Sequence, residues 1–303
     1  MNDKFLKDNG YVVAIIGIGL IGGSMAIALK QNGFAVKVIG VDENPLHCNE
    51  ALHLKLVDEV LDPEAAMQEA DIIILATPVN IADVLISKIL SLVDTQVVID
   101  VGSTKNSICI LADLHANRGR FVASHPMWGT EFSGPSAAVK DAFKNKAVVI
   151  CGKDKSDPDA IRIAENLYKS MDMHLLYMDS IAHDLHAAYI SHISHISSFA
   201  LANTVLEKEK EENAIFEMAS GGFESTVRLA KSNASMWLPI FKHNRENILD
   251  VLNEHITQLK KFKSCLEKEN YGYLLDLITN ANDIKKVLDP AARVQIADKE
   301  DLN

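Results

Sequence analysis

The chain has 303 residues, which is enough for two domains, and its 48% of hydrophobic residues is typical of a globular protein. Its 30 basic and 41 acidic residues leave a net charge of −11, which argues against a phosphate-backbone partner such as DNA or RNA. No segment approaches the roughly 18 consecutive apolar residues of a membrane span, and the N-terminus lacks the apolar core of a signal peptide. The four cysteines lie far apart, as expected for reduced thiols, so we expect a cytoplasmic protein.

Short apolar, β-branched segments alternate with helix-length segments through the first part of the chain. The predicted strands are Tyr11–Ile16, Val36–Val41, Ile72–Ala76, Val97–Val101, Phe121–Ser124, Ala147–Cys151 and Leu175–Met178. The predicted helices include Gly22–Asn32, Pro63–Glu69, Ile81–Ser91 and Asp157–Met171. Because several strands are apolar along their whole length, both faces of the sheet should be covered, as in parallel sheets. The pattern predicts an α/β fold with a Rossmann-type, doubly wound and mostly parallel sheet.

The character of the sequence changes after Asp179. From Ser180 to Leu288 the pattern is helical, with strong helix formers between three breaks, at Gly221-Gly222, Ser232-Asn233 and Asn270-Tyr271-Gly272. We therefore predict an all-α C-terminal domain, with the chain divided into residues 1–179 and residues 180–303.

A glycine-rich turn follows the first predicted strand. Gly17, Gly19 and Gly22 have the G-x-G-x-x-G spacing, with Leu20 and Ile21 between the last two, and a helix of small residues follows. The first glycine allows a tight turn, the second lets the backbone approach a pyrophosphate, and the third lets the helix pack closely on the sheet. Since helix N-terminal amides also favour an anion, these five residues are predicted to bind a dinucleotide.

The cofactor is predicted from the end of the next strand. Asp42 stands there, about 20 residues after the last glycine of the turn, where a carboxylate can accept hydrogen bonds from the ribose 2′-hydroxyl. The same carboxylate would repel a 2′-phosphate, so NAD is favoured over NADP. Thr77 and Pro78, which follow the third predicted strand, are expected to line the adenosine side.

Two polar residues follow other predicted strands. His125 comes directly after Phe121–Ser124, and Ser103 comes after Val97–Val101. The carboxyl ends of strands border the ligand crevice of an open α/β sheet, and histidine is the usual acceptor of a hydroxyl proton near neutral pH. The residues alone leave other roles open, namely a hydrogen-bonded structural histidine for His125 and a helix N-cap for Ser103.

Histidines and serines gather near the start of the helical part. Four of the histidines could suggest a metal site: His183, His186, His192 and His195. On a straight α-helix they point in different directions, and the first and last are about 18 Å apart along the axis, so no metal is predicted. The same geometry places Ser191, His195 and Ser198 on one polar stripe, which suits either a polar substrate or hydrogen bonds to neighbouring helices.

Four segments in this order resemble the prephenate/arogenate dehydrogenase family of tyrosine-biosynthesis enzymes. They are GIGLIGGSMA at 17–26, DVGSTK at 100–105, SHPMWGTE at 124–131, and SHISH at 191–195 with the later GGFESTVRLAKSNASMW at 221–237. The first is shared with many oxidoreductases, whereas the third and the last are specific when they occur together. The resemblance spans nearly the whole chain.

The resemblance implies an NAD-dependent oxidative decarboxylation of a cyclohexadienol. In such a reaction hydride passes from ring C4 to the nicotinamide, the C4 hydroxyl loses its proton, and CO₂ leaves as the ring becomes aromatic. His125 would take that proton, and Ser103 would position both His125 and the C4 hydroxyl. Prephenate is the preferred substrate, although arogenate, which carries an amine in place of the keto group, stays open.

The resemblance also implies a set of substrate-binding residues: Thr130, Glu131, Ser191, His195, Arg228 and Trp237. A guanidinium binds carboxylates bidentately, although the residues alone would make Arg228 a solvated helix arginine and Trp237 a core residue. The chain departs from the family pattern at Glu224 and Ser225, where many members carry a basic–acidic pair, and at the bulky Trp128.

Two other functions remain to be weighed. A β-hydroxyacid dehydrogenase or imine reductase also joins a Rossmann domain to helices, but the G-x-x-G-x-G-x-x-x-K run of the hydroxyacid group is absent here. A non-catalytic NAD-binding regulator would have little use for Ser103, His125, His195 and Arg228 together. By the resemblance, the long apolar helices between Ile215 and Leu288 are expected to form a homodimer.

Overall fold

The computed structural model describes residues 10–212 and 214–288. Its strands are β1 (Tyr11–Ile16), β2 (Ala35–Val41), β3 (Glu59–Val60), β4 (Ile72–Leu75), β5 (Val97–Asp100), β6 (Phe121–Pro126), β7 (Ala147–Cys151) and β8 (His174–Met178). Its α-helices are α1 (Leu20–Gln31), α2 (Pro45–His53), α3 (Pro63–Glu69), α4 (Val79–Leu92), α5 (Asn106–Asp113), α6 (Pro158–Ser170), α7 (Ser180–Ala187), α8 (Ile193–Glu212), α9 (Gly221–Val227), α10 (Ala234–His243), α11 (Arg245–Glu267), α12 (Tyr271–Ala281) and α13 (Lys285–Leu288). In these described ranges no helix combines the length and the apolar character needed to cross a bilayer.

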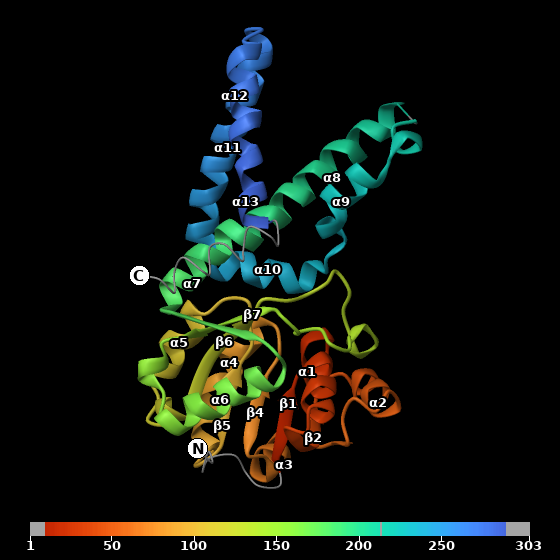
Figure 1. Cartoon of the computed structure of the whole chain (residues 1–303). Helices are drawn as coiled ribbons and strands as arrows, with labels where there is room; N and C mark the ends of the chain where they lie inside the picture. Colours follow the sequence, from red (N-terminus) through yellow and green to blue (C-terminus); the bar gives the residue numbers. More distant parts are fainter. Residues whose placement is uncertain (1–9, 213, 289–303) are drawn as a thin grey trace. The chain divides into compact units, whose positions relative to one another are not determined.

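The eight strands form one sheet in the order β3-β2-β1-β4-β5-β6-β7-β8 (Figure 1). The first six strands of this order run parallel, β7 is antiparallel to β6, and β8 is parallel to β7. The strand order reverses between β1 and β4, which in doubly wound sheets is the place where a dinucleotide binds. The predicted Rossmann-type, mostly parallel sheet is confirmed.

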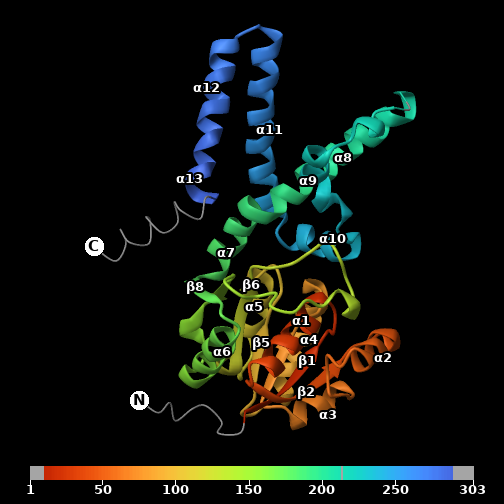
Figure 2. The same cartoon turned by 45° about the vertical axis from the view of Figure 1, so that its right-hand side comes forward.

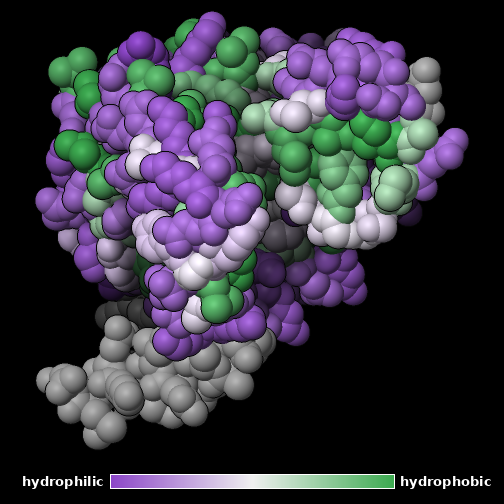
Figure 3. Space-filling model, turned by 90° about the horizontal axis from the view of Figure 1, so that it is seen from above, coloured by the Kyte–Doolittle hydropathy of each residue, from purple (hydrophilic) through white to green (hydrophobic). Residues whose placement is uncertain are grey.

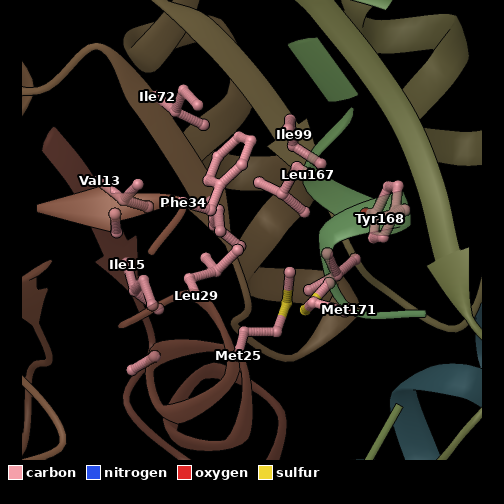
Figure 4. Packing of buried hydrophobic residues seen from close by; sticks show 14 of the residues in the cluster. Val13, Ile15, Met25, Leu29, Phe34, Ile72, Ile99, Leu167, Tyr168 and Met171 are labelled. Carbon is pink, nitrogen blue, oxygen red and sulfur yellow. The ribbon is translucent and has the colours of Figure 1, made fainter. Parts of the chain in front are cut away.

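Both faces of the sheet are buried, because alternate side chains of the central strands enter different cores. In β1, Val13 and Ile15 join a cluster with residues of α1 and α6 on one face, which Figure 4 shows in detail. Ala14 and Ile16 join a second cluster with residues of α3, α4 and α5 on the opposite face. The two sets of helices can be followed in Figures 1 and 2. This double burial explains why the strands are apolar along their whole length.

Several elements differ from the sequence-based expectation. The strand β3 and the helices α2 and α5 were not predicted, although Asn44 caps α2 by accepting from the Leu46 amide (3.0 Å) and Pro45 opens it. Strand β6 continues two residues beyond its predicted end. The first part of the helical region is also interrupted, since Ala188–His192 is a π-helical turn between α7 and α8.

The chain contains two compact units, Met1–Ile248 and Leu249–Asn303. The first unit includes the sheet and the helices up to α10, and the second contains most of α11 together with α12 and α13. Helices alone follow β8 in the described part of the chain, as predicted for the C-terminal region. The proposed functional division at 179/180 remains a prediction.

Candidate active site

The glycine-rich turn joins β1 to α1 and has the geometry that its spacing predicts. Gly17 has a φ of +97°, and a Cβ there would lie 2.6 Å from the Ala76 carbonyl oxygen. A Cβ on Gly22 would lie 2.0 Å from the Gly17 carbonyl oxygen, so only glycine lets α1 start this close to the turn. Gly19, the N-cap of α1, faces open space instead. The turn therefore offers an approachable backbone at a helix N-terminus, followed directly by Leu20 and Ile21.

Asp42 follows β2 and is tied to this turn. One carboxylate oxygen accepts from the Ile18 amide (3.0 Å), and the other accepts from the Asn44 amide (2.9 Å). The His47 imidazole lies 3.3 Å from the second oxygen. The side chain of Asp42 is 11% exposed, so it retains a face that a ribose hydroxyl can reach.

Thr77 and Pro78 lie between β4 and α4, across from the glycine turn at the place where the strand order reverses between β1 and β4. Pro78 is the N-cap residue of α4. The hydroxyl oxygen of Thr77 is buried and has no hydrogen-bond partner among the residues that the structure describes. A buried unpaired hydroxyl is costly, and a polar cofactor atom would satisfy it. The cradle at Gly19, the Asp42 carboxylate and the Thr77 hydroxyl together fit a dinucleotide.

His125 and Ser103 lie at the same edge of the sheet. Asp100 of β5 pairs with Ala123 of β6, so both strands reach their carboxyl ends beside each other. His125 is within β6, near its end, and Ser103 is in the loop from β5 to α5. The sequence therefore placed both residues correctly at the carboxyl edge, where the glycine turn and Thr77 also lie.

The loop that contains Ser103 is held by a buried ion pair. The ammonium group of Lys105 contacts the Asp100 carboxylate, and both side chains are almost fully buried. Asp100 also accepts from the Gly102 amide (3.0 Å), and its own carbonyl accepts from the Ser124 hydroxyl (2.6 Å). The alternative role of Ser103 as a helix N-cap is wrong, because Lys105 occupies the N-cap position of α5.

His125 is hydrogen-bonded to a residue that sequence reasoning missed. Its Nδ1 lies 2.9 Å from Nε2 of His183 in α7, and Nδ1 of His183 lies 2.8 Å from the Asp184 carboxylate. Burial, followed by the nearby His183, Lys105 and His192, lowers the pKa of His125 well below 6.5. His125 is therefore neutral at pH 7, which a general base requires.

The π-helical turn changes the geometry assumed for the next helix. It falls between His183 and His195, so the straight-helix spacing used to compare their directions is wrong. The ring of His195 stacks on Trp237 with centroids 3.5 Å apart, and its Nδ1 lies 3.0 Å from the Ser191 carbonyl oxygen. Ser198 donates to the Thr226 carbonyl (3.0 Å), so this member of the predicted polar stripe bonds to a neighbouring helix.

Arg228 follows α9 and pairs with a residue of the β6–β7 connection. Its Nη1 lies 2.9 Å from the Glu131 carboxylate, and half of its side chain is exposed. Thr130 accepts from the Phe132 amide (3.3 Å) in the same connection. An open pocket of about 690 Å³ lies beside the pair, with Glu131, Lys231 and Asn233 in its lining. The structure thus brings Arg228, the predicted carboxylate-binding residue, into contact with Glu131, which was predicted to border the substrate pocket.

Family comparisons agree with this arrangement. Residues 25–177 match the family model "Prephenate dehydrogenase, nucleotide-binding domain", and residues 179–280 match "Prephenate dehydrogenase, dimerization domain". A prephenate dehydrogenase of Bacillus subtilis is 32% identical over 90% of this chain and 75% of its own length. The chain belongs to the prephenate dehydrogenase family.

Solved structures of the family share the fold. The structure of prephenate dehydrogenase from Aquifex aeolicus with hydroxyphenyl propionate and NAD⁺ has a TM-score of 0.84 and 28% identity, covering 92% of this chain and 98% of that one. The arogenate dehydrogenase of Synechocystis has a TM-score of 0.73 and 25% identity, covering 91% and 99%. The chain is therefore an NAD-dependent dehydrogenase with the fold of this family.

The departures from the family pattern have local explanations. Glu224 lies 3.6 Å from the Lys231 ammonium, so the acidic residue ahead of Arg228 has its own exposed partner. The Trp128 ring packs edge-on against Phe143 with centroids 5.4 Å apart. Its bulk is thus accommodated by the core rather than by the substrate pocket.

Proposed function

We propose that the chain oxidatively decarboxylates prephenate to 4-hydroxyphenylpyruvate with NAD⁺ in tyrosine biosynthesis. The observation that supports this most directly is a neutral, hydrogen-bonded His125 at the sheet edge that also carries the glycine turn. A dehydrogenase needs a base near its cofactor, and no other residue type suits that role better at neutral pH.

A bound NAD⁺ would supply the acceptor for the hydride of ring C4. His125 holds the proton that the C4 hydroxyl gives up and can return it to the phenolate oxygen once CO₂ has left. Ser103, on the neighbouring loop, positions that hydroxyl against His125. Gly19 and the first amides of α1 would hold the pyrophosphate, and Asp42 would bind the ribose. The chain mainly aligns the reactants, which is worth on the order of 7–11 kcal/mol at best.

The helical side of the site binds the substrate. Arg228, now paired with Glu131, would bind a substrate carboxylate in place of that pair, and Thr130 lies next to Glu131 in the same connection. His195 and Ser191 contact the polar side chain of the substrate. Trp237 forms an aromatic wall behind His195, which stacks on it.

The test is NADH formation by the full chain with prephenate or arogenate, each with NAD⁺ or NADP⁺. We expect prephenate with NAD⁺ to give the highest kcat/KM. His125→Asn should keep its NAD⁺ affinity while turnover falls at least about 100-fold, the lower end for lost acid–base catalysis. Unchanged turnover would exclude His125 as the base, and tight NAD⁺ binding without any NADH would favour a non-catalytic regulator.

Arogenate is the second candidate substrate. The similarity to the arogenate dehydrogenase of Synechocystis is the observation in its favour. The curated relatives named prephenate dehydrogenase, at 32% and 30% identity, favour prephenate. A higher kcat/KM with arogenate in the same assay would reverse the assignment.

We also propose a homodimer formed through the helical region and located in the cytoplasm. The family model matched by residues 179–280 is described as a dimerization domain. Apolar patches lie among hydrophilic side chains on the face drawn in Figure 3. Large exposed hydrophobic side chains on these helices include Leu201, Leu206, Tyr271, Leu275 and Ile278. Such side chains are typical of a surface that another subunit covers.

A further inference from the structure

His125 is the first member of a chain of three buried or partly buried groups. Its Nδ1 contacts Nε2 of His183 at 2.9 Å, and Nδ1 of His183 contacts Oδ1 of Asp184 at 2.8 Å. His183 and Asp184 are each only 3% exposed, so water does not compete for these bonds. The far end of the chain is therefore a buried carboxylate.

The proton positions along this chain follow from its last member. Burial raises the pKa of Asp184, but the His183 imidazole and then two backbone amides lower it by more, so the net pKa lies below 3.8. An ionised carboxylate only accepts, so Nδ1 of His183 donates to Asp184, and an imidazole that has its single proton there has a bare Nε2. That Nε2 then accepts from Nδ1–H of His125. The remaining ring nitrogen of His125, Nε2, is left free to take a proton.

Asp184 also holds the loop on the other side of the site. Its Oδ1 accepts from the Lys105 amide (2.8 Å) and its Oδ2 accepts from the Asn106 amide (2.9 Å). These two residues open α5 and end the loop that contains Ser103. The Asp184 carbonyl accepts in turn from the Asn244 side chain (2.6 Å), which fixes α7 against the residues after α10.

We propose that Asp184 is a positioning residue for both His125 and the loop that contains Ser103. Through His183 it fixes His125 in the Nδ1–H tautomer, and through the α5 amides it sets the position of Ser103. This inference rests on the proposed function. A carboxylate that orients one imidazole is a known arrangement, whereas here a second histidine lies between carboxylate and base. The charge that forms on His125 during turnover is also stabilised by Asp184 through the same bonds.

Two isosteric replacements of His183 separate the tautomer effect from packing. Gln reaches the position of Nε2 with an oxygen that can accept from His125, while Met has a similar length and no acceptor. We expect His183→Gln to retain kcat within about tenfold and His183→Met to lose about 100-fold, with KM changed less than about threefold. Equal losses in both variants would mean that His183 only fills space.

The matched control is His243, another histidine that contacts the α5 loop. Its Nδ1 lies 3.4 Å from the Thr104 hydroxyl and its Nε2 lies 3.8 Å from Asp83, but it has no bond to His125. His243→Gln and His243→Met should therefore give the same kcat as each other. A Gln–Met difference at His243 as large as that at His183 would contradict the proposal.

A second measurement does not depend on turnover. Nitrogen-15 NMR of the histidine-labelled full chain should show His125 protonated on Nδ1 and bare on Nε2. Asp184→Ala should lower Tm and also give His125 a mixture of both tautomers. Protonation of Nε2 in the unsubstituted chain, or an unchanged tautomer in Asp184→Ala, would overturn the relay. If the chain makes no NADH from prephenate or arogenate while the NMR result holds, the proposed function fails and the positioning network stands.

Discussion

At the scale of single residues, the site depends on groups whose charge is set by burial. Burial lowers the pKa of His192 to about 4, and it also lowers that of His195, where Arg228 adds to the effect against the opposing Ser191 carbonyl. His125 is shifted in the same direction. These histidines are thus neutral at pH 7, and Arg228 is a positive group on the helical side that can pair with an anionic substrate.

The depressed pKa of His125 predicts where activity is lost in acid. In the proposed reaction its base form is the active one, and because its pKa lies well below 6.5 the base persists as the pH falls through 6.5. The charged or titratable groups that face it are His183, Lys105 and His192. We expect kcat/KM to stay level down to pH 6.5 and to decline only below that value. The measurement is a pH profile of kcat/KM with prephenate.

His125→Asn provides the control for this profile. Its residual activity should lack the same acidic decline, since the titrating base is gone. A decline in the unsubstituted chain that begins at or above pH 7, or one that survives in His125→Asn, would show that another group is responsible.

Asp42, the predicted ribose-binding residue, also supports the glycine turn. The strand-end position predicted a ribose-binding carboxylate, and the structure adds a hydrogen bond to the Ile18 amide within the glycine turn. Replacing Asp42 would therefore disturb the turn as well as the proposed ribose contact. Preference for NAD over NADP is best read from the unsubstituted chain, as in the assay above.

At the scale of elements, the β5–α5 loop is held by the buried pair of Lys105 and Asp100. Burial raises the pKa of Asp100, which reflects the cost of its charge and makes the lysine necessary. We expect Lys105→Met to lower the free energy of unfolding by about 3–5 kcal/mol, because it leaves a buried carboxylate without its positively charged partner. Urea denaturation measures this change.

The matched control is Lys37, which pairs with Glu59 and Glu69 at the surface of the same sheet. Lys37→Met should leave the urea midpoint nearly unchanged, as is typical of exposed pairs. If the two variants were equally stable, the Lys105–Asp100 pair would not be what holds the loop.

Most strands and the cofactor turn could be predicted from local sequence. Continuous apolar runs marked the buried strands, and the glycine spacing has one well-defined geometric solution. The two-residue β3 has too little sequence to give a pattern. The π-helical turn at Ala188–His192 has the same composition as the α-helices around it, so it left no signal.

Site residues that directly follow a strand could be located from the sequence. A contact between residues far apart in the chain could not. His125 and Ser103 follow strands, so the rule for strand ends located them. His183 lies 58 residues from His125 in the sequence, and only the packing of α7 brings the two rings together. Lys105 was visible at the end of the DVGSTK segment, but its burial beside Asp100 depends on the folded sheet.

At the scale of the whole molecule, the proposed dimer accounts for apolar side chains that the second unit leaves exposed. Tyr271, Leu275 and Ile278 follow one another at helical spacing on α12 and are each more than 45% exposed. A monomer gains nothing from an apolar stripe in water, whereas an isologous interface buries the same stripe on both subunits.

This interpretation predicts that charges on the stripe dissociate the dimer. The unsubstituted chain should show twice its 33.3 kDa mass in light scattering coupled to size-exclusion chromatography. Burial of a Leu or Ile side chain contributes about 1.5–3 kcal/mol, and a symmetric interface loses each contribution twice. The double variant Leu275→Lys/Ile278→Lys should therefore run as a monomer, while Asn280→Lys, on the opposite side of α12, should remain dimeric. A double variant that keeps the dimer mass would place the interface on other helices, and a monomeric unsubstituted chain would refute the dimer itself.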